Sequence, residues 1–209
     1  MIKAVLFDMD GVLLDARELH FTALNMALEP FGATISHVEH ESTFDGLPTK
    51  TKLEKLTQLG RVRVQDHGTI NFQKQLLTKS LLREFIHPNN AHLALMEALR
   101  EKKYKIGLAS NSIAETVQIA MELTDLGKFM EFTLSTENVT TPKPNPEIYL
   151  LAIKKMGVAP NETLVIEDNE HGVEAARLSG AHILQVASVD EVNQENIFRE
   201  ISEINESWR

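Results

Sequence analysis

The sequence contains no cysteine, only one tryptophan and only two tyrosines. Without cysteine, the chain has no disulfides, no thiolate nucleophile and no cysteine-bound zinc. It also lacks an apolar run long enough to span a membrane, and its first apolar run stops at Asp8, too early for a signal peptide. We therefore expect a cytoplasmic protein with no membrane partner.

Positive charge is also scarce. The chain has 21 lysines and arginines against 30 acids, a formal net charge of -9. This balance disfavours nucleic acid or an anionic membrane as the main partner. The 209 residues, 43% of them hydrophobic, can form one core, with or without an inserted module. A monomer is the default expectation.

Hydrophobic patterns divide the chain into two kinds of segment. After a short apolar strand at 4–7, residues 16–87 show helical spacing and no convincing strand. Their helices are expected at 17–28, 51–59 and 72–85, with a polar loop that carries His37 and His40 at the surface. From residue 91 onward, helices and strands alternate, which is typical of βαβ units and a parallel sheet. The later strands are expected at 104–109, 132–134, 163–166 and 182–186, and the helices at 93–99, 114–123, 147–156, 173–178 and within 190–209.

This order predicts an α/β fold. Residues 1–15 and 88–209 should form a Rossmann-like parallel-sheet core. Residues 16–87 should form an all-helical cap domain, inserted after the first strand. Right-handed crossovers are nearly obligatory for such parallel connections.

Two acids follow the first strand directly. Asp8 and Asp10 are two residues apart, so in an extended chain they point to the same side. Two buried carboxylates repel each other unless a cation lies between them or one is protonated. Gly11 then allows a sharp turn of the backbone. The pair predicts a site for a hard metal ion, most simply Mg²⁺, at the carboxyl end of the strand.

The other polar clusters also follow predicted strands or lie in a loop between them. Ser110 and Asn111 follow one strand, Glu167 and Asp168 follow another, and Lys143 lies between prolines in a rigid loop. The carboxyl ends of parallel strands share one edge of a sheet, so these residues should meet there.

These residue types suit phosphoryl transfer. Asp8 could attack phosphorus and form an aspartyl-phosphate, while Asp10 handles the proton. Mg²⁺ would bridge Asp8 and Asp168, and Lys143 would neutralise charge on the phosphoryl group. Ser110 and nearby groups would hydrogen-bond its oxygens.

Four stretches, FDMDG, LASNS, TPKPNPE and IEDNEHGVEAA, resemble the four motifs of the haloacid dehalogenase superfamily, in the family's order. The resemblance implies that Asp8 is the nucleophile and Asp10 the acid/base, with Asp10 touching the metal through its backbone. It also implies that Glu167 and Asp168 form the acidic pair of the metal site, with Asp168 as the direct ligand and Glu167 either a second ligand or a residue that orients one. Ser110 and Lys143 are the implied phosphate-binding residues, and Asn111, which follows Ser110, is a candidate substrate-binding residue. The presence of Asp10 implies a phosphoryl-transferring member rather than a dehalogenase.

The helical insertion resembles the cap of the β-phosphoglucomutase-like branch, which closes over the substrate. By that resemblance, His20 and Lys74 are candidate substrate-binding residues. The mutases carry an arginine for the distal phosphate in a cap loop; here Thr49 stands at the matching position and Lys50 follows it. Lysine does not reproduce the two-pronged geometry of arginine on phosphate. This difference favours a phosphatase over a mutase.

The leading hypothesis is a Mg²⁺-dependent phosphomonoester hydrolase that acts on a small phosphorylated metabolite, such as a sugar phosphate. The first alternative is a phosphohexomutase, which would return the phosphoryl group to the sugar. A non-catalytic sugar-phosphate-binding regulator is the alternative from another class. The intact acids and lysine favour an enzyme over this last alternative.

Overall fold

The structure, a computed structural model, describes residues 1–207. It divides into two compact units. The sheet unit comprises Met1–Asp15 and the chain from His87 onward, and the helical unit comprises Ala16–Ile86. His87, which we expected in the inserted segment, therefore belongs to the sheet unit.

The sheet unit is built on five parallel strands in the order β3-β2-β1-β4-β5. The strands are β1 (Ala4–Phe7), β2 (Lys105–Ala109), β3 (Phe132–Leu134), β4 (Thr163–Glu167) and β5 (His182–Gln185). The first strand of the chain is thus the central one. Every residue of β1 is fully buried, which explains its unbroken apolar run.

Strand register brings distant parts of the chain to one level. Phe7 pairs with Leu108 on β2 and with Ile166 on β4. The residues that follow these three positions therefore emerge side by side at the carboxyl edge of the sheet. They include Asp8, Ala109 and Glu167, and Ser110 directly follows Ala109, the last residue of β2.

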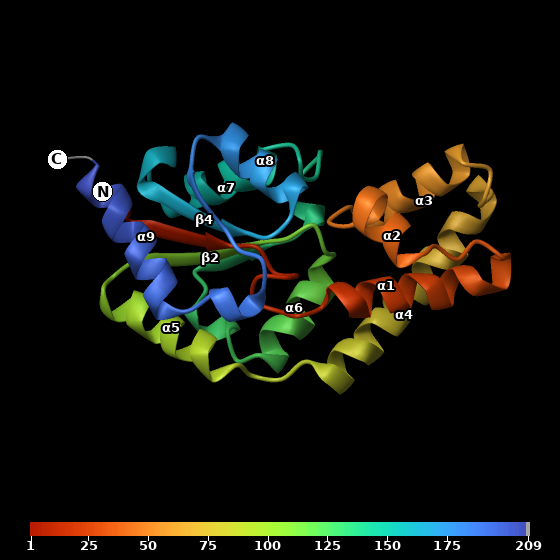
Figure 1. Ribbon diagram of the computed structural model, residues 1–209, viewed down its shortest axis with the longest axis horizontal. Helices are drawn as coiled ribbons and strands as arrows, with labels where there is room; N and C mark the ends of the chain where they lie inside the picture. Colours follow the sequence, from red (N-terminus) through yellow and green to blue (C-terminus); the bar gives the residue numbers. More distant parts are fainter. Residues whose placement is uncertain (208–209) are drawn as a thin grey trace. The chain divides into compact units, whose positions relative to one another are not determined.

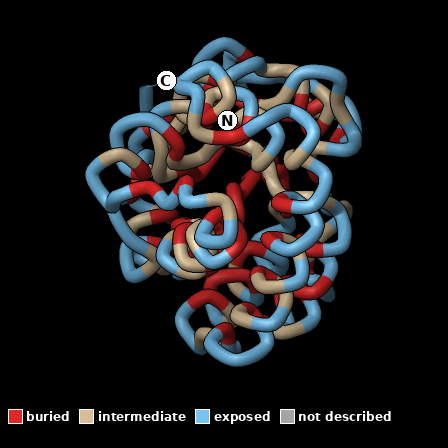
Figure 2. Tube along the Cα trace, turned by 90° about the vertical axis from the view of Figure 1, so that its right-hand side faces the viewer, coloured by how far each residue is buried: buried red, intermediate tan, exposed pale blue. Residues whose placement is uncertain are grey.

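Helices cover both faces of this sheet. Figure 1 shows α7 and α8 on one face and α5 and α6 on the other, and α9 packs against α5. Their bounds are α5 (Asn90–Glu101), α6 (Ala114–Leu123), α7 (Glu147–Met156), α8 (Glu170–Ser179) and α9 (Gln194–Glu206). Tyr149 on α7 is fully buried in the core cluster beneath α7 and α8. In Figure 2 the buried segments, in red, lie within the exposed helices and loops, in pale blue. The part of the predicted C-terminal helix at 208–209 lies outside the described residues.

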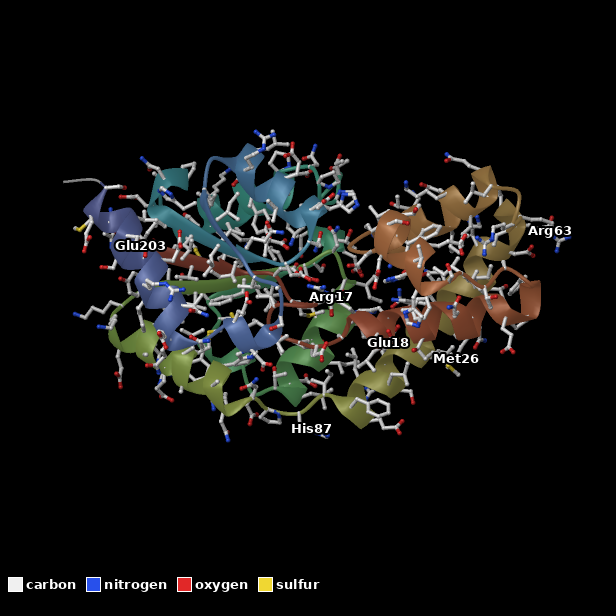
Figure 3. The ribbon with its side chains drawn as sticks, viewed as in Figure 1. Arg17, Glu18, Met26, Arg63, His87 and Glu203 are labelled. Carbon is white, nitrogen blue, oxygen red and sulfur yellow. The ribbon has the colours of Figure 1, made fainter. Side chains whose placement is uncertain are left out.

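The helical unit contains no strand within its described residues, as expected from the sequence. Its main elements are α1 (Arg17–Leu28), α2 (His37–Glu39), η2 (His40–Phe44), α3 (Thr49–Gln58) and α4 (His67–Phe85). α1 and α4 pack along each other, and a separate core that includes Phe21, Leu24 and Ile70 fills the unit. Met26 and Arg63 project from its surface (Figure 3). Among residues 1–207, no helix combines the length and the hydropathy that a membrane crossing requires.

The expected polar loop around residues 36–40 is wrong, because this stretch is helical. Ser36 and Glu39 form a capping box that starts α2, and a π-helical turn, η2, continues it. His40 is only 5% exposed, so its expected place at the surface is also wrong. α4 begins at His67 rather than at residue 72, because its first turn carries few apolar residues that a periodic pattern could reveal.

Candidate active site

Three strand ends form the floor of the site. The backbone N–H of Asp8 donates to Ile166 O at 3.0 Å, so the pairing of β1 with β4 continues into the first acid. Ser110 N–H likewise donates to Leu134 O at 2.9 Å. Both residues, and Glu167 at the end of β4, are buried. The sheet itself therefore holds the nucleophile candidate in place.

Lys143 lies at the centre of the buried polar network. Its ammonium donates to Asp8 Oδ1 at 2.6 Å, Glu167 Oε1 at 2.7 Å, Tyr149 Oη at 2.8 Å and Ala109 O at 2.8 Å. The lysine side chain is 2% exposed. A buried ammonium with two carboxylates and further acceptors is a satisfied cation rather than a solvated surface lysine.

Two side chains, Asn111 and Glu147, hydrogen-bond the backbone of the loop that carries Lys143. Asn111 Oδ1 accepts the backbone N–H of Lys143 at 3.1 Å, and Asn111 Nδ2 donates to Lys143 O at 3.3 Å. The Glu147 carboxylate accepts the N–H groups of Thr140 and Thr141, each at 2.9 Å. Asn111, predicted to bind substrate, thus also holds the lysine loop.

Electrostatics at Asp8 favour a further cation. Burial raises the pKa of Asp8 well above its usual value; the Lys143 ammonium opposes this, and the charges of Glu167, Asp168 and Asp10 reinforce it. Burial alone lowers the pKa of Lys143, but Asp8 and Glu167 outweigh it and the pKa is raised. The carboxylates therefore outnumber the ammonium charge that stabilises them.

The donor set fits Mg²⁺. Asp8, Glu167 and Asp168 each offer a carboxylate oxygen, and these three atoms lie within 4.8 Å of one another. Carboxylate oxygens are the protein ligands that Mg²⁺ prefers. The excess of buried negative charge is the environment in which such an ion is stable. Three of the four predicted metal residues, Asp8 after β1 and Glu167 and Asp168 at the end of β4, are thus brought together.

Asp10 leaves the strand through a tight turn. Gly11 adopts a positive φ of 90°, and its N–H donates to Leu14 O at 2.6 Å. A side chain is strained in this conformation, which explains the glycine. Ser112 Oγ donates to Asp10 Oδ2 at 2.9 Å, which orients the second acid.

Glu167, the last residue of β4, and Asp168, the residue after it, have different surroundings. Asn169, not Asp168, caps α8, since its Oδ1 accepts the Gly172 N–H at 3.0 Å. The capping role at the start of α8 therefore belongs to Asn169. Glu167 is fully buried and hydrogen-bonded to Lys143 and to Tyr149 Oη, the latter at 2.5 Å.

Ser110 is 1% exposed, and its Oγ accepts the Ser112 N–H at 3.0 Å. This bond uses a lone pair of the oxygen, so the hydroxyl can still donate to an acceptor. The predicted phosphate-binding hydroxyl is therefore oriented by its own loop.

The predicted residues of the helical unit fall into two groups. His20 on α1 and Lys74 on α4 come together, with His20 Nδ1 and Lys74 Nζ 3.3 Å apart. Thr49 and Lys50 lie in the first turn of α3, where Lys50 is exposed. Lys52, also on α3, was not predicted from the sequence, and it is only 7% exposed.

Two residues of the sheet unit were also missed. Tyr149 stands on the apolar face of α7, so periodicity assigns it to the core and does not reveal its hydroxyl contacts. Gly172 lies inside α8, where a glycine is unfavourable and signals a close approach. A Cβ at Gly172 would lie 1.8 Å from Glu167 Oε1.

The family model described as haloacid dehalogenase-like hydrolase matches residues 5–186. The chain belongs to this family. The match covers β1 through β5 and the whole helical unit, including all four motifs. The resemblance inferred from the sequence is therefore confirmed.

Relatives of this haloacid dehalogenase-like hydrolase are named as phosphatases. A phosphorylated carbohydrates phosphatase of Thermotoga maritima is 30% identical over 86% of this chain and 82% of its own. A pyrophosphatase of Bacillus velezensis is 27% identical over 89% of this chain and 83% of its own. The expected enzyme class, a phosphatase of this family, is confirmed.

A solved structure, the β-phosphoglucomutase of Clostridium difficile, covers 97% of this chain and 98% of its own with a TM-score of 0.84. Its sequence identity is 23%, so the likeness concerns the fold alone. The predicted fold class, a Rossmann-like parallel sheet with a helical cap, is confirmed.

Proposed function

We propose that this phosphatase is a Mg²⁺-dependent phosphomonoester hydrolase that works through an aspartyl-phosphate on Asp8. One observation carries the proposal: Asp8 is buried at the end of the central strand, 2.6 Å from the Lys143 ammonium and within reach of the Asp168 carboxylate. A carboxylate in this setting is held rigidly and is shielded from water, as a nucleophile for phosphorus requires.

In the first step, an Asp8 oxygen attacks the substrate phosphorus, and the bond from phosphorus to the ester oxygen breaks. Asp10 donates its proton to the departing oxygen. Lys143 and the Ser110 hydroxyl stabilise the charge on the transferring phosphoryl group. The products of this step are an alcohol and phosphorylated Asp8.

In the second step, the Asp10 carboxylate takes a proton from a water molecule, and the oxygen of that water attacks phosphorus. The bond from phosphorus to Asp8 breaks, which releases inorganic phosphate and regenerates both acids. The hydrogen bond from Ser112 keeps Asp10 oriented in both steps.

Asp8, Asp168 and Glu167 would hold Mg²⁺, with Asp10 contributing its backbone carbonyl as the family resemblance implies. When bound, the ion supplies positive charge that makes the phosphoryl group a better electrophile. We keep the assignment of Lys143 and Ser110 to phosphate binding and that of Asn111 to substrate binding.

The proposed substrate is a small phosphorylated metabolite, and a sugar phosphate is the first class to test. The name of the Thermotoga maritima relative supports it, and the relatives also include a pyrophosphatase. We assign recognition of the remainder of the substrate to His20, Lys74, Thr49 and Lys50. We further propose that the enzyme acts as a monomer in the cytoplasm.

The test is phosphate release from a panel of sugar phosphates, phosphoglycolate and pyrophosphate, with and without Mg²⁺. We expect turnover with Mg²⁺, loss of activity with a chelator, and recovery when Mg²⁺ is restored. Asp8→Asn should abolish turnover. Asp125→Asn, at an exposed position of the sheet unit, is the matched control and should be fully active.

Persistent turnover in Asp8→Asn would overturn the covalent mechanism. Glucose 1-phosphate separates the two catalytic alternatives, because a hydrolase releases phosphate whereas a phosphohexomutase yields glucose 6-phosphate. Trapping of a phosphorylated Asp8 in rapidly quenched wild-type protein would support the intermediate directly.

A further inference from the structure

The hydroxyl of Tyr149 belongs to the same buried network as the nucleophile. It accepts from Lys143 Nζ at 2.8 Å and donates to Glu167 Oε1 at 2.5 Å. Tyr149 is fully buried on α7, and its ring packs in the core beneath that helix. A phenol in a core normally needs one partner; this one joins two charged groups of the site.

The two oxygens of Glu167 differ in the lone pairs that they have left. Each carboxylate oxygen has about two acceptor positions. Lys143 and Tyr149 occupy both positions on Oε1. Oε2 accepts the Asp168 N–H at 3.1 Å and, at 3.5 Å, a long contact from Asn169 Nδ2. Oε2 is therefore the atom with capacity for a further bond.

The lysine does not depend on the tyrosine for its own hydrogen bonds. An ammonium has three donors, and Lys143 has four acceptors around it, namely Asp8, Glu167, Tyr149 and Ala109. Without the phenol oxygen, three acceptors remain for three donors. The phenol hydrogen, in contrast, serves Glu167 alone.

From this geometry we propose that Tyr149 is a positioning residue for the metal site: it holds Glu167 Oε1 against Lys143, so that Glu167 can offer a cation only Oε2. The inference rests on the metal dependence proposed above. Tyr149 touches no reacting atom and acts through Glu167.

Restricting Glu167 to one ligand oxygen in a fixed position should favour binding of Mg²⁺ more than binding of Ca²⁺. Mg²⁺ requires a near-ideal octahedron with short bonds, whereas Ca²⁺ accepts one or both oxygens of a carboxylate in flexible geometry. Removal of the phenol hydrogen leaves Oε1 with one donor and allows the carboxylate to rotate. The site should then lose preference for Mg²⁺.

The experiment is calorimetric titration of the full chain with Mg²⁺ and, separately, with Ca²⁺. Tyr149→Phe keeps the ring in the core and removes only the hydroxyl. We expect its Mg²⁺ dissociation constant to rise about tenfold, while that for Ca²⁺ changes less than about threefold. Tyr104→Phe removes the other tyrosine hydroxyl of the chain and should leave both constants unchanged.

A second arm tests whether the effect passes through Glu167. In a Glu167→Gln background, Tyr149→Phe should no longer alter the preference between the ions. If Glu167→Gln does not fold, the single tyrosine variants still decide the question. A proportional loss for both ions indicates general loosening and overturns the inference, as does no change at all. Failure of the wild-type chain to bind either ion would instead overturn the proposed metal dependence, and this inference with it.

Discussion

The Lys143 ammonium stabilises the charged forms of the buried acids Asp8 and Glu167. Lys143 is hydrogen-bonded to both Asp8 and Glu167, which lie at the ends of neighbouring strands. Removing one partner from a buried ionic network leaves an uncompensated charge, which is more costly than replacing the whole network. The lysine assigned to phosphate therefore also has a structural role in the free protein.

We predict that Lys143→Met lowers the free energy of unfolding by about 3–5 kcal/mol at neutral pH, because Asp8 and Glu167 remain buried without their cation. Loss of the ammonium raises the pKa of Asp8 further, so protonation at lower pH should reduce the difference from wild type. Urea unfolding at pH 7 and pH 5 measures both effects. Lys154→Met, at an exposed position on α7, is the control and should change stability by less than about 0.5 kcal/mol. Equal stability of the two variants would contradict the prediction.

The sequence contained enough information to select the acids, Ser110 and Lys143, because their chemistry is unusual directly after buried strands. It did not reveal Tyr149 or the burial of Lys52. The bond between Lys143 and Asp8 joins positions 135 residues apart, and that between Tyr149 and Glu167 joins positions 18 apart. Such partners are determined by how β1, β4 and α7 pack, and no local pattern records them.

Helix α8 lies too close to Glu167 to carry a side chain at Gly172. Its residue Gly172 lies against the Glu167 carboxylate, where an added Cβ would be 1.8 Å from Oε1 and 2.2 Å from Oε2. Alanine is the better helix former at such a position, so packing overrides helix propensity here.

Gly172→Ala should displace the Glu167 carboxylate and weaken Mg²⁺ binding and turnover about tenfold or more. Titration with Mg²⁺ and phosphate release measure the two effects. Gly68→Ala is the matched control, because Gly68 also lies in a helix, α4, and an added Cβ there meets nothing within 4 Å. That variant should keep its activity and gain up to about 1 kcal/mol of stability. Normal metal binding in Gly172→Ala would contradict this account of α8.

Elements with strong periodicity were predictable from the sequence. The expected helices at 17–28, 114–123 and 147–156 coincide with α1, α6 and α7. The helical turns at 37–44 could not be predicted in this way. The polar residues there resemble a loop, and only the capping box of Ser36 and Glu39 indicates where the helix starts. Local hydrogen bonds, rather than an apolar face, explain that difference.

Each of the two units has its own core, and the helical unit also contains a buried histidine that makes stability depend on pH. The helical unit buries His40, and this burial lowers the pKa of His40 to about 4; the nearby charge of Lys52 lowers it and that of Asp45 raises it. In the unfolded chain an ordinary histidine takes up its proton near pH 6.5. Between these values the unfolded state binds more protons, so stability is complete above pH 6.5 and decreases as the pH falls towards 4.

We therefore expect the wild-type chain to lose more stability between pH 7 and pH 5 than His40→Gln, whose side chain does not titrate. Denaturant unfolding of both proteins at the two pH values measures the difference. His87→Gln removes an exposed histidine and should behave as the wild type does. Equal losses in all three proteins would show that His40 is not responsible.

The position of β1 has a consequence for synthesis of the chain. Ala4 pairs with Lys105 on β2 and with Thr163 on β4, so the first strand made by the ribosome has no partner until about half of the chain has been made, and it lacks its second partner until Thr163 has followed. The helical unit is continuous in sequence and can fold in the interval, since domains generally fold as units during translation. Asp8, the proposed nucleophile, is thus among the first residues synthesised, and its surroundings are complete only after β4 has been made. On the proposed mechanism, we expect a growing chain on the ribosome to be inactive towards phosphate esters until β4, which carries Glu167, has left the exit tunnel.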